Sequence, residues 1–245
     1  MTIDNFDIIR AHLTFNPATK FDAKTKKLKL LNSTYDRYII QILNRAKDTE
    51  GKKRGSNTGN RLIKTYEVPS LEYFDAKRPH IIELCESNNA RAYIHPQVRS
   101  TYDCLTEMIK IGIDNLENPT IKFQHIMRSC LCAMHKSRDK KWIIDLDNDE
   151  MYGWTVDGVL SLVKENLKSC KKSPDEAYTV PTKNGMHIVT SPFNLASAAK
   201  ICPMMFEGVR KFPYTISVGP GEYEEHFHKR TGWLHKDGMT LLACP

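Results

Sequence analysis

The sequence lacks long apolar runs, and it contains no internal repeat and no Pro-rich or low-complexity linker. Its first residues, MTIDNFDIIRAHL, include Asp4 and Asp7 where a signal peptide or a membrane anchor needs an uninterrupted apolar segment. These absences argue against a secreted or membrane-anchored protein. We therefore expect a cytoplasmic protein with no membrane partner.

Paired cysteines are also missing. The seven cysteines are an odd number, they are scattered along the chain, and none of them forms a CxxC pair. A disulfide framework requires pairing, and a four-ligand zinc ribbon requires CxxC pairs, so the sequence argues against both. We expect reduced thiols, most of them in the core.

The composition that remains is that of an ordinary globular protein. The 245 residues are 40% hydrophobic and 27% charged, with 12 Gly and 12 Pro, and a chain of this length can bury a core without cross-links. The net charge of +7 is unevenly spread, because residues 1–64 hold 14 basic and 6 acidic side chains and the rest of the chain holds 22 and 23. The basic surplus is therefore N-terminal, and it favours a polyanionic partner.

We interpret residues 1–64 as a basic N-terminal helical segment and loop. The stretch Ile39–Ala46, IIQILNRA, has apolar residues at helical spacing and predicts an amphipathic helix. The stretch Gly51–Asn60, GKKRGSNTGN, has the composition of a loop. Its basic residues Lys52, Lys53 and Arg54 fit either a solvated loop or contacts with nucleic-acid phosphates.

Residues 65–245 alternate between predicted strands and helices, which indicates an α/β or α+β fold. We predict strands over Arg61–Val68, Arg91–Pro96, Lys141–Leu146, Tyr178–Pro181, Met186–Thr190, Tyr214–Val218 and Met239–Ala243. We predict helices over Ala76–Ser87 with Pro79 in its first turn, Ser100–Leu116, Ile126–Met134, Thr155–Leu167 and from Asn194 towards Cys202. Thr155 and Asn194 are expected to cap their helices, and Thr182–Gly185 is expected to form a tight turn.

The acidic residues Asp145, Asp147 and Asp149 alternate where the strand KWIIDL ends. Alternate residues of a strand share a face, so these carboxylates converge and repel one another unless a divalent cation neutralises them. The alternative is a plain acidic turn. An EF-hand is excluded, because Glu150 and Val156 stand where its loop requires Gly and Glu.

A second group of polar residues lies in the turn and strand Lys183–Thr190, KNGMHIVT. The turn brings a cation, a hydroxyl and a glycine close to His187, and such donors suit a triphosphate. The alternative for a lone histidine on a strand is a hydrogen-bonded core residue.

Together, the apolar strand WIIDLD and the later segment Gly185-Met186-His187 resemble the catalytic core of the archaeo-eukaryotic primase superfamily, which includes the primase-polymerases of phages and mobile elements. That family has an apolar strand ending in Asp-x-Asp, then a small residue-x-His, then a third acid entering an apolar strand. We choose Asp237 as the third acid, with Glu207 and Glu222 as alternatives. The resemblance implies a core with an RRM-like antiparallel sheet flanked by helices.

The resemblance also implies the chemistry and the partners. Asp145, Asp147 and Asp237 would bind two Mg²⁺ or Mn²⁺ ions for template-directed transfer of nucleotides onto a 3′-hydroxyl. The partners would be a single-stranded DNA template and nucleoside triphosphates, with a separate helicase as a further candidate. His187 would contact the nucleotide phosphates, and Lys183 and Thr182 could assist. Gly185 replaces the serine that many members carry.

Two arginines in the segment RAYIHPQVRS are further candidates by position. Arg91 is a candidate nucleotide contact and Arg99 a candidate nucleic-acid contact, and a surface ion pair is the alternative for each.

Two other functions stay open. His226 and His228 form a His-hydrophobic-His triplet that resembles the metal pair of HUH endonucleases, with Tyr35 and Tyr38 as candidate nucleophiles, although a charged surface loop is the expected structure there. A non-catalytic nucleic-acid-binding protein on the same fold is the other alternative.

Overall fold

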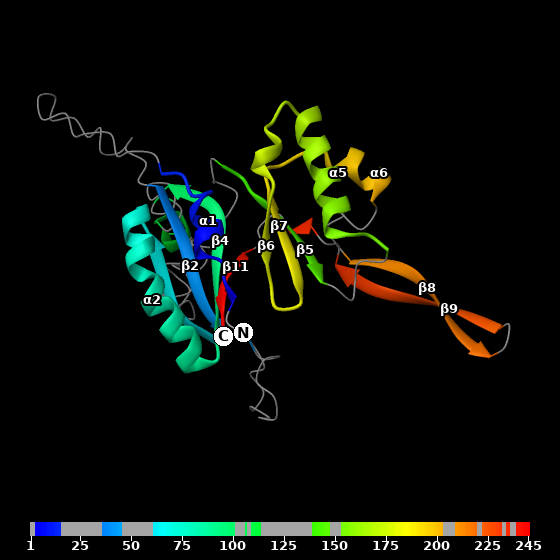
Figure 1. Cartoon of the computed structure of the whole chain (residues 1–245), viewed down its shortest axis with the longest axis horizontal. Helices are drawn as coiled ribbons and strands as arrows, with labels where there is room; N and C mark the ends of the chain where they lie inside the picture. The colour runs from blue at the N-terminus through cyan, green and yellow to red at the C-terminus, as the bar shows by residue number, and fades with distance from the viewer. Residues whose placement is uncertain are drawn as a thin grey trace, which may run out of the picture. The chain divides into compact units, whose positions relative to one another are not determined.

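The computed structural model describes residues 3–15, 36–45, 61–100, 106, 109–113, 139–147, 153–202, 209–219, 222–231, 234–235 and 239–245. The chain divides into two compact units: unit 1 is residues 1–140 with 239–245, and unit 2 is residues 141–238. Each unit has an antiparallel sheet and helices of its own (Figure 1). The predicted α+β class, with antiparallel sheets flanked by helices, is confirmed.

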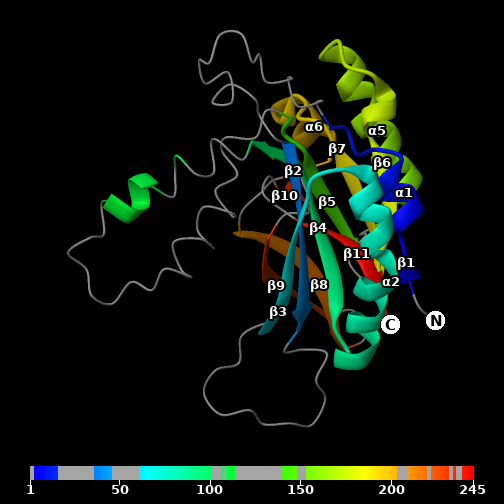
Figure 2. The same cartoon turned by 90° about the vertical axis from the view of Figure 1, so that its left-hand side faces the viewer.

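Unit 1 is built on a five-stranded sheet in the order β1-β11-β4-β2-β3, in which every neighbouring pair is antiparallel. Figure 2 shows α1 and α2 along the same side of this sheet. The elements are β1 (Ile3–Asp4), α1 (Phe6–Arg10), β2 (Asp36–Asn44), β3 (Arg61–Val68), α2 (Leu71–Asn88), β4 (Arg91–Ser100) and β11 (Thr240–Cys244). The predicted boundary between residues 1–64 and 65–245 does not coincide with the division into units. Residue 64 lies within β3, and β3 is paired with β2.

The helix predicted over Ile39–Ala46 is wrong, because the chain forms β2 as far as Asn44. β2 lies between β3 and β4, and Ile39, Ile40 and Ile42 are each 1% exposed or less. A short run of apolar residues suits a buried helix or a buried strand equally well. Because β2 pairs with β3 on one side and β4 on the other, this segment forms a strand. The loop Gly51–Asn60, with Lys52, Lys53 and Arg54, lies outside the described residues.

The helix α2 begins earlier than predicted. Ser70 caps it by accepting a hydrogen bond from the Tyr73 backbone N–H, so Pro79 lies inside the helix and not in its first turn. Proline in a helix interior removes one backbone hydrogen bond. The buried side chains Phe74, Ile81 and Cys85 hold the helix against the sheet across this position.

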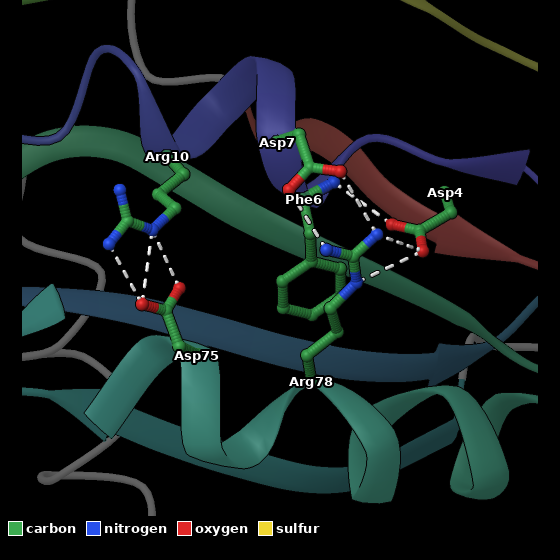
Figure 3. Close-up of polar contacts among 6 residues, drawn as sticks. All are labelled: Asp4, Phe6, Asp7, Arg10, Asp75 and Arg78. Carbon is green, nitrogen blue, oxygen red and sulfur yellow. Dashed lines mark hydrogen bonds and ion pairs between the residues drawn. The ribbon is translucent and has the colours of Figure 1, made fainter. Parts of the chain in front are cut away.

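Within unit 1, two arginines join the N-terminal segment to α2 (Figure 3). Arg78 of α2 donates to Asp4 at 2.7 Å and to Asp7 at 2.9 Å, and its guanidinium lies over the Phe6 ring. Arg10 of α1 binds both carboxylate oxygens of Asp75 on α2. These contacts join β1 and α1 to α2 across more than sixty residues of sequence.

Unit 2 has a four-stranded antiparallel sheet in the order β10-β5-β7-β6. Its elements in chain order are β5 (Trp142–Asp147), α5 (Val156–Ser169), a 3-10 turn η5 (Pro174–Glu176), β6 (Tyr178–Pro181), β7 (Gly185–Thr190), α6 (Leu195–Ile201), the hairpin β8 (Val209–Gly219) with β9 (Glu222–Thr231), and β10 (Leu234–His235). Apart from η5 and the hairpin, this is the β-α-β-β-α-β order of the ferredoxin-like and RRM-like folds. The strands β5, β6, β7 and β8, the capping residues Thr155 and Asn194, and the turn before β7 match the predictions, whereas the strands β9 and β10 were not predicted.

One face of the unit 2 sheet packs against α5 and α6. The buried cluster contains Ile144 and Leu146 of β5 and Ile188 of β7, together with Val159 of α5 and Ala198 of α6. Because side chains alternate along a strand, the residues between these core positions lie on the opposite face. Asp145, Asp147 and His187 are such residues.

Candidate active site on the sheet face of unit 2 opposite its helices

The register of β5 and β7 places the predicted site residues opposite one another. Asp145 pairs with His187, and Asp147 pairs with Gly185. His187 Nε2 lies 3.2 Å from Asp145 Oδ1, with 39% of the Asp145 side chain and 11% of the His187 side chain exposed. The structure therefore brings together two motifs that are about forty residues apart in the sequence.

The environment of His187 fits both interpretations, because the residue is buried and has a carboxylate partner. Its cross-strand neighbours are Asp145 on β5 and Val180 on β6, so it lies away from the core that faces the helices. A carboxylate that accepts from one ring nitrogen holds the imidazole in one orientation. His187 is thus a positioned imidazole at the edge of an exposed acidic group.

Gly185 is required by the close approach of two strands. A Cβ atom at this position would overlap the carbonyl oxygen of Leu146 and would lie 3.0 Å from the Cα of Asp147. The Cβ of a serine would meet the same backbone atoms. The glycine therefore has a steric reason in this chain.

The turn before β7 carries the cation nearest in sequence to the site. The Thr182 backbone N–H donates to the Gly185 carbonyl at 3.0 Å, and Lys183 and Asn184 are exposed. Because Gly185 pairs with Asp147, the turn follows directly on the end of the sheet where Asp147 lies. Thr182 and Lys183 are therefore close along the chain to Gly185, the cross-strand partner of the second acid.

The donor set suits a hard divalent cation. Asp145 and Asp147 present carboxylate oxygens on one face, and Mg²⁺ is commonly held by one or two carboxylates, with water and substrate phosphates supplying the remaining ligands. Within the described ranges, no group of three or more His, Cys, Asp or Glu residues is placed to hold a metal ion. Two carboxylates on one face thus suit an ion that also binds water and a substrate.

Several of the predicted acids cannot be placed. Asp149, Asp237 and Glu207 lie outside the described residues, and Glu222 is described only as a backbone position at the start of β9. The short strand β10 nevertheless brings in a residue that the sequence analysis missed. His235 pairs with Ile143 of β5, which puts it on the face that carries Asp145. The register of β10 was not predictable, because the strand has only two residues.

Arg91 and Arg99 lie on β4 of unit 1. They are 7% and 4% exposed, so an ion pair at the surface is ruled out for both. Their neighbour His95 is also buried and was missed by the sequence analysis. The alternation of Arg91, Tyr93 and His95 along a strand was the available signal, because it predicts a polar face.

The prediction of a charged surface loop around His226 and His228 is wrong, because the backbone there forms a strand. Both residues lie in β9, where His226 pairs with Tyr214 and His228 with Phe212 of β8. The candidate nucleophiles include Tyr35 and Tyr38, and Tyr35 lies outside the described residues. Tyr38 is 1% exposed, and its hydroxyl donates to the Thr14 carbonyl and accepts from the Thr14 N–H, both at 3.1 Å. Tyr38 is therefore a core residue and not an accessible nucleophile.

Comparison with known proteins gives no relative, because no family model, curated protein or solved structure matches this chain. In the described part of the chain, no helix has the length and apolarity needed to cross a membrane.

Proposed function

We propose that this protein is a primase-polymerase-like nucleotidyltransferase that joins nucleoside triphosphates to a 3′-hydroxyl on a single-stranded DNA template. The observation that carries the proposal is the cross-strand contact of Asp145 with His187, with Asp147 on the same face of an RRM-like sheet, opposite the helices. A structural ion pair could explain the contact alone. It would not explain why a second carboxylate, a glycine without space for a side chain and an exposed lysine follow at the same end of the two strands.

Each residue has a role in the proposed reaction. Asp145 and Asp147 hold divalent cations together with a third acid, for which Asp237 is the candidate. A bound pair of Mg²⁺ or Mn²⁺ ions supplies activation of the 3′-hydroxyl and neutralises charge on the leaving pyrophosphate. His187, oriented by Asp145, donates to the nucleotide phosphates, and the ammonium of Lys183 and the hydroxyl of Thr182 add donors at the turn.

The test is primer synthesis and primer extension with Mg²⁺ or Mn²⁺, comparing the wild-type protein with Asp145→Asn and His187→Ala. Asp157→Asn is the matched control, because Asp157 is an exposed carboxylate in the first turn of α5, on the helical side of the same sheet. We expect a loss of at least about 100-fold in the two site variants, the scale of losing one electrostatic contact to a transition state. The control should retain wild-type activity.

Wild-type inactivity on every template, or full activity of Asp145→Asn, would reject the proposal. Metal-dependent cleavage of single-stranded DNA that requires His226 but not Asp145 would instead identify an HUH-type endonuclease. Salt-sensitive binding of nucleic acid without any nucleotide-dependent heat in calorimetry would identify a non-catalytic binding protein.

A further inference from the structure

A second polar site lies in unit 1, on the side of the sheet that faces away from α2. The Tyr66 ring meets the His80 ring of α2 edge-on at 6.3 Å, and Tyr66 pairs with Ile40 of β2. Tyr66 and Ile40 therefore face the helix. Because side chains alternate along a strand, Arg37 and Ile39 of β2 face the opposite side.

The register of β2 with β4 brings three donor-bearing residues to this opposite face. His95 pairs with Ile39, and Arg99 pairs with Arg37. Two residues of β2 thus span four residues of β4, so the register shifts between them. Such a bulge redirects side chains, and bulges are common beside functional sites. Cross-strand partners share a face, so Arg37, His95 and Arg99 lie together.

His95 is a buried histidine whose ring has no hydrogen-bond partner in the described part of the chain. Only 4% of the residue is exposed, and among the described residues neither ring nitrogen has a hydrogen-bond partner. Burial, with a smaller contribution from the Arg99 charge, lowers the pKa of His95 to about 3. The imidazole is therefore neutral near pH 7 and offers one N–H donor and one acceptor. A buried polar group of this kind requires an explanation, and a ligand supplies one.

We propose that Arg37, His95 and Arg99 form a binding site for a phosphate group, supplied by a nucleotide or by the backbone of a nucleic acid. Guanidinium groups match phosphate oxygens with paired N–H donors, and a neutral imidazole adds a further donor. A metal cation is disfavoured, because two permanently charged guanidinium groups lie at facing positions. Arg37 is half-buried and gives the site a side open to solvent.

On the described strands of this sheet, one acidic residue shares this face. Glu67 of β3 pairs with Ile39 on the side away from His95, and it is exposed. Ile39 therefore separates the carboxylate from the imidazole in the same row of the sheet. Arg37, Arg99 and Glu67 together still carry a net positive charge, which favours an anion on this face.

The first experiment measures binding of inorganic pyrophosphate by calorimetry, at constant ionic strength and without divalent cations. Arg37→Gln removes one guanidinium from the site, and Arg61→Gln is the matched control. Arg61 pairs with Asn44 at the other end of β2, so its substitution makes the same change of charge in the same sheet. We expect Arg37→Gln to bind at least about tenfold more weakly and Arg61→Gln to bind like the wild type.

The His187→Ala background separates this site from the proposed nucleotide site of unit 2, because the phosphate site does not depend on the transfer reaction. Pyrophosphate binding that persists in His187→Ala and is weakened by Arg37→Gln supports the proposal. Binding that disappears in His187→Ala, equal weakening by the two arginine variants, or no binding at all would overturn it.

The second experiment observes His95 directly and does not depend on how well a variant folds. In ¹³C-labelled histidine spectra, His95→Gln assigns the resonance, and the wild-type protein is titrated with pyrophosphate. We expect the His95 ring resonance to shift with the same affinity as the calorimetric event, and an unmoved His95 resonance would refute the site. Parallel titrations with a nucleoside triphosphate and with a single-stranded oligonucleotide lacking terminal phosphates identify the source of the phosphate.

Discussion

Substituting Gly185 by alanine tests whether the candidate site depends on the close approach of β7 to β5. The added Cβ would overlap the carbonyl oxygen of Leu146 and lie 3.0 Å from the Cα of Asp147. Both contacts are backbone atoms, and Leu146 lies between the paired positions Asp145–His187 and Asp147–Gly185. The clash can therefore be relieved only by moving one strand. Inserting a methyl group into such a site costs about 2 kcal/mol of unfolding free energy.

A loss of about 2 kcal/mol lowers Tm by roughly 4–8 °C in a chain of this size. Differential scanning calorimetry measures it, with Gly112→Ala as the matched control. Gly112 lies in a helical segment, and a Cβ there would meet no atom within 4 Å. Alanine should therefore stabilise that segment by roughly 0.5–1 kcal/mol. If Gly185→Ala melts at or above the wild-type temperature, the steric account of this glycine is wrong.

Three further predictions concern unit 1. Arg78→Ala should lower the free energy of unfolding in urea by about 1 kcal/mol, because partly exposed ion pairs and one cation–π contact are lost; Arg78→Lys should recover part of it. Burial raises the pKa of the Cys85 thiol to about 12, so iodoacetamide at pH 8 should modify Cys170 well before Cys85, as peptide mass spectrometry can check. Because the folded-state pKa of His95 is lowered to about 3, the unfolded chain takes up the extra proton first, and stability should fall as pH drops from about 6.5 to 3. His95→Gln should flatten that slope in urea titrations, and an unchanged slope would contradict the burial of a neutral imidazole.

Local signals predicted most of unit 2. An apolar run before Asp145 indicated β5, Thr155 and Asn194 indicated helix starts, and the turn residues before Gly185 indicated the β6–β7 hairpin. Each of these signals acts over a few residues, because capping bonds and turn geometry involve only near neighbours in the chain. This is why β5, the β6–β7 hairpin and the starts of α5 and α6 followed from the sequence, whereas β9 and β10 did not.

The errors in unit 1 have the opposite cause. Whether Ile39–Asn44 is a strand depends on β3 and β4, and whether Pro79 lies inside a helix depends on the buried residues that hold α2 to the sheet. These are contacts between distant segments, and such contacts override local preference.

In the candidate site, too, the sequence predicted some features and only the structure showed the others. Asp145, Asp147 and His187 were predicted as site residues from the spacing of the acids and from the later glycine and histidine. Carboxylates and imidazoles have a chemistry that can be recognised in a sequence. Only the register showed that Asp145 faces His187, and only the approach of two backbones explained Gly185.

The sequence by itself determined the charge distribution, the absence of paired cysteines and the residues able to bind cations or phosphates. The tertiary structure decided which of these residues meet. It placed His95 in a buried position beside Arg99, and it put two acids on the face of a sheet that the helices leave uncovered. The physical reason is that burial and facing partners are properties of strand pairing, and strand pairing joins residues that are far apart in the chain.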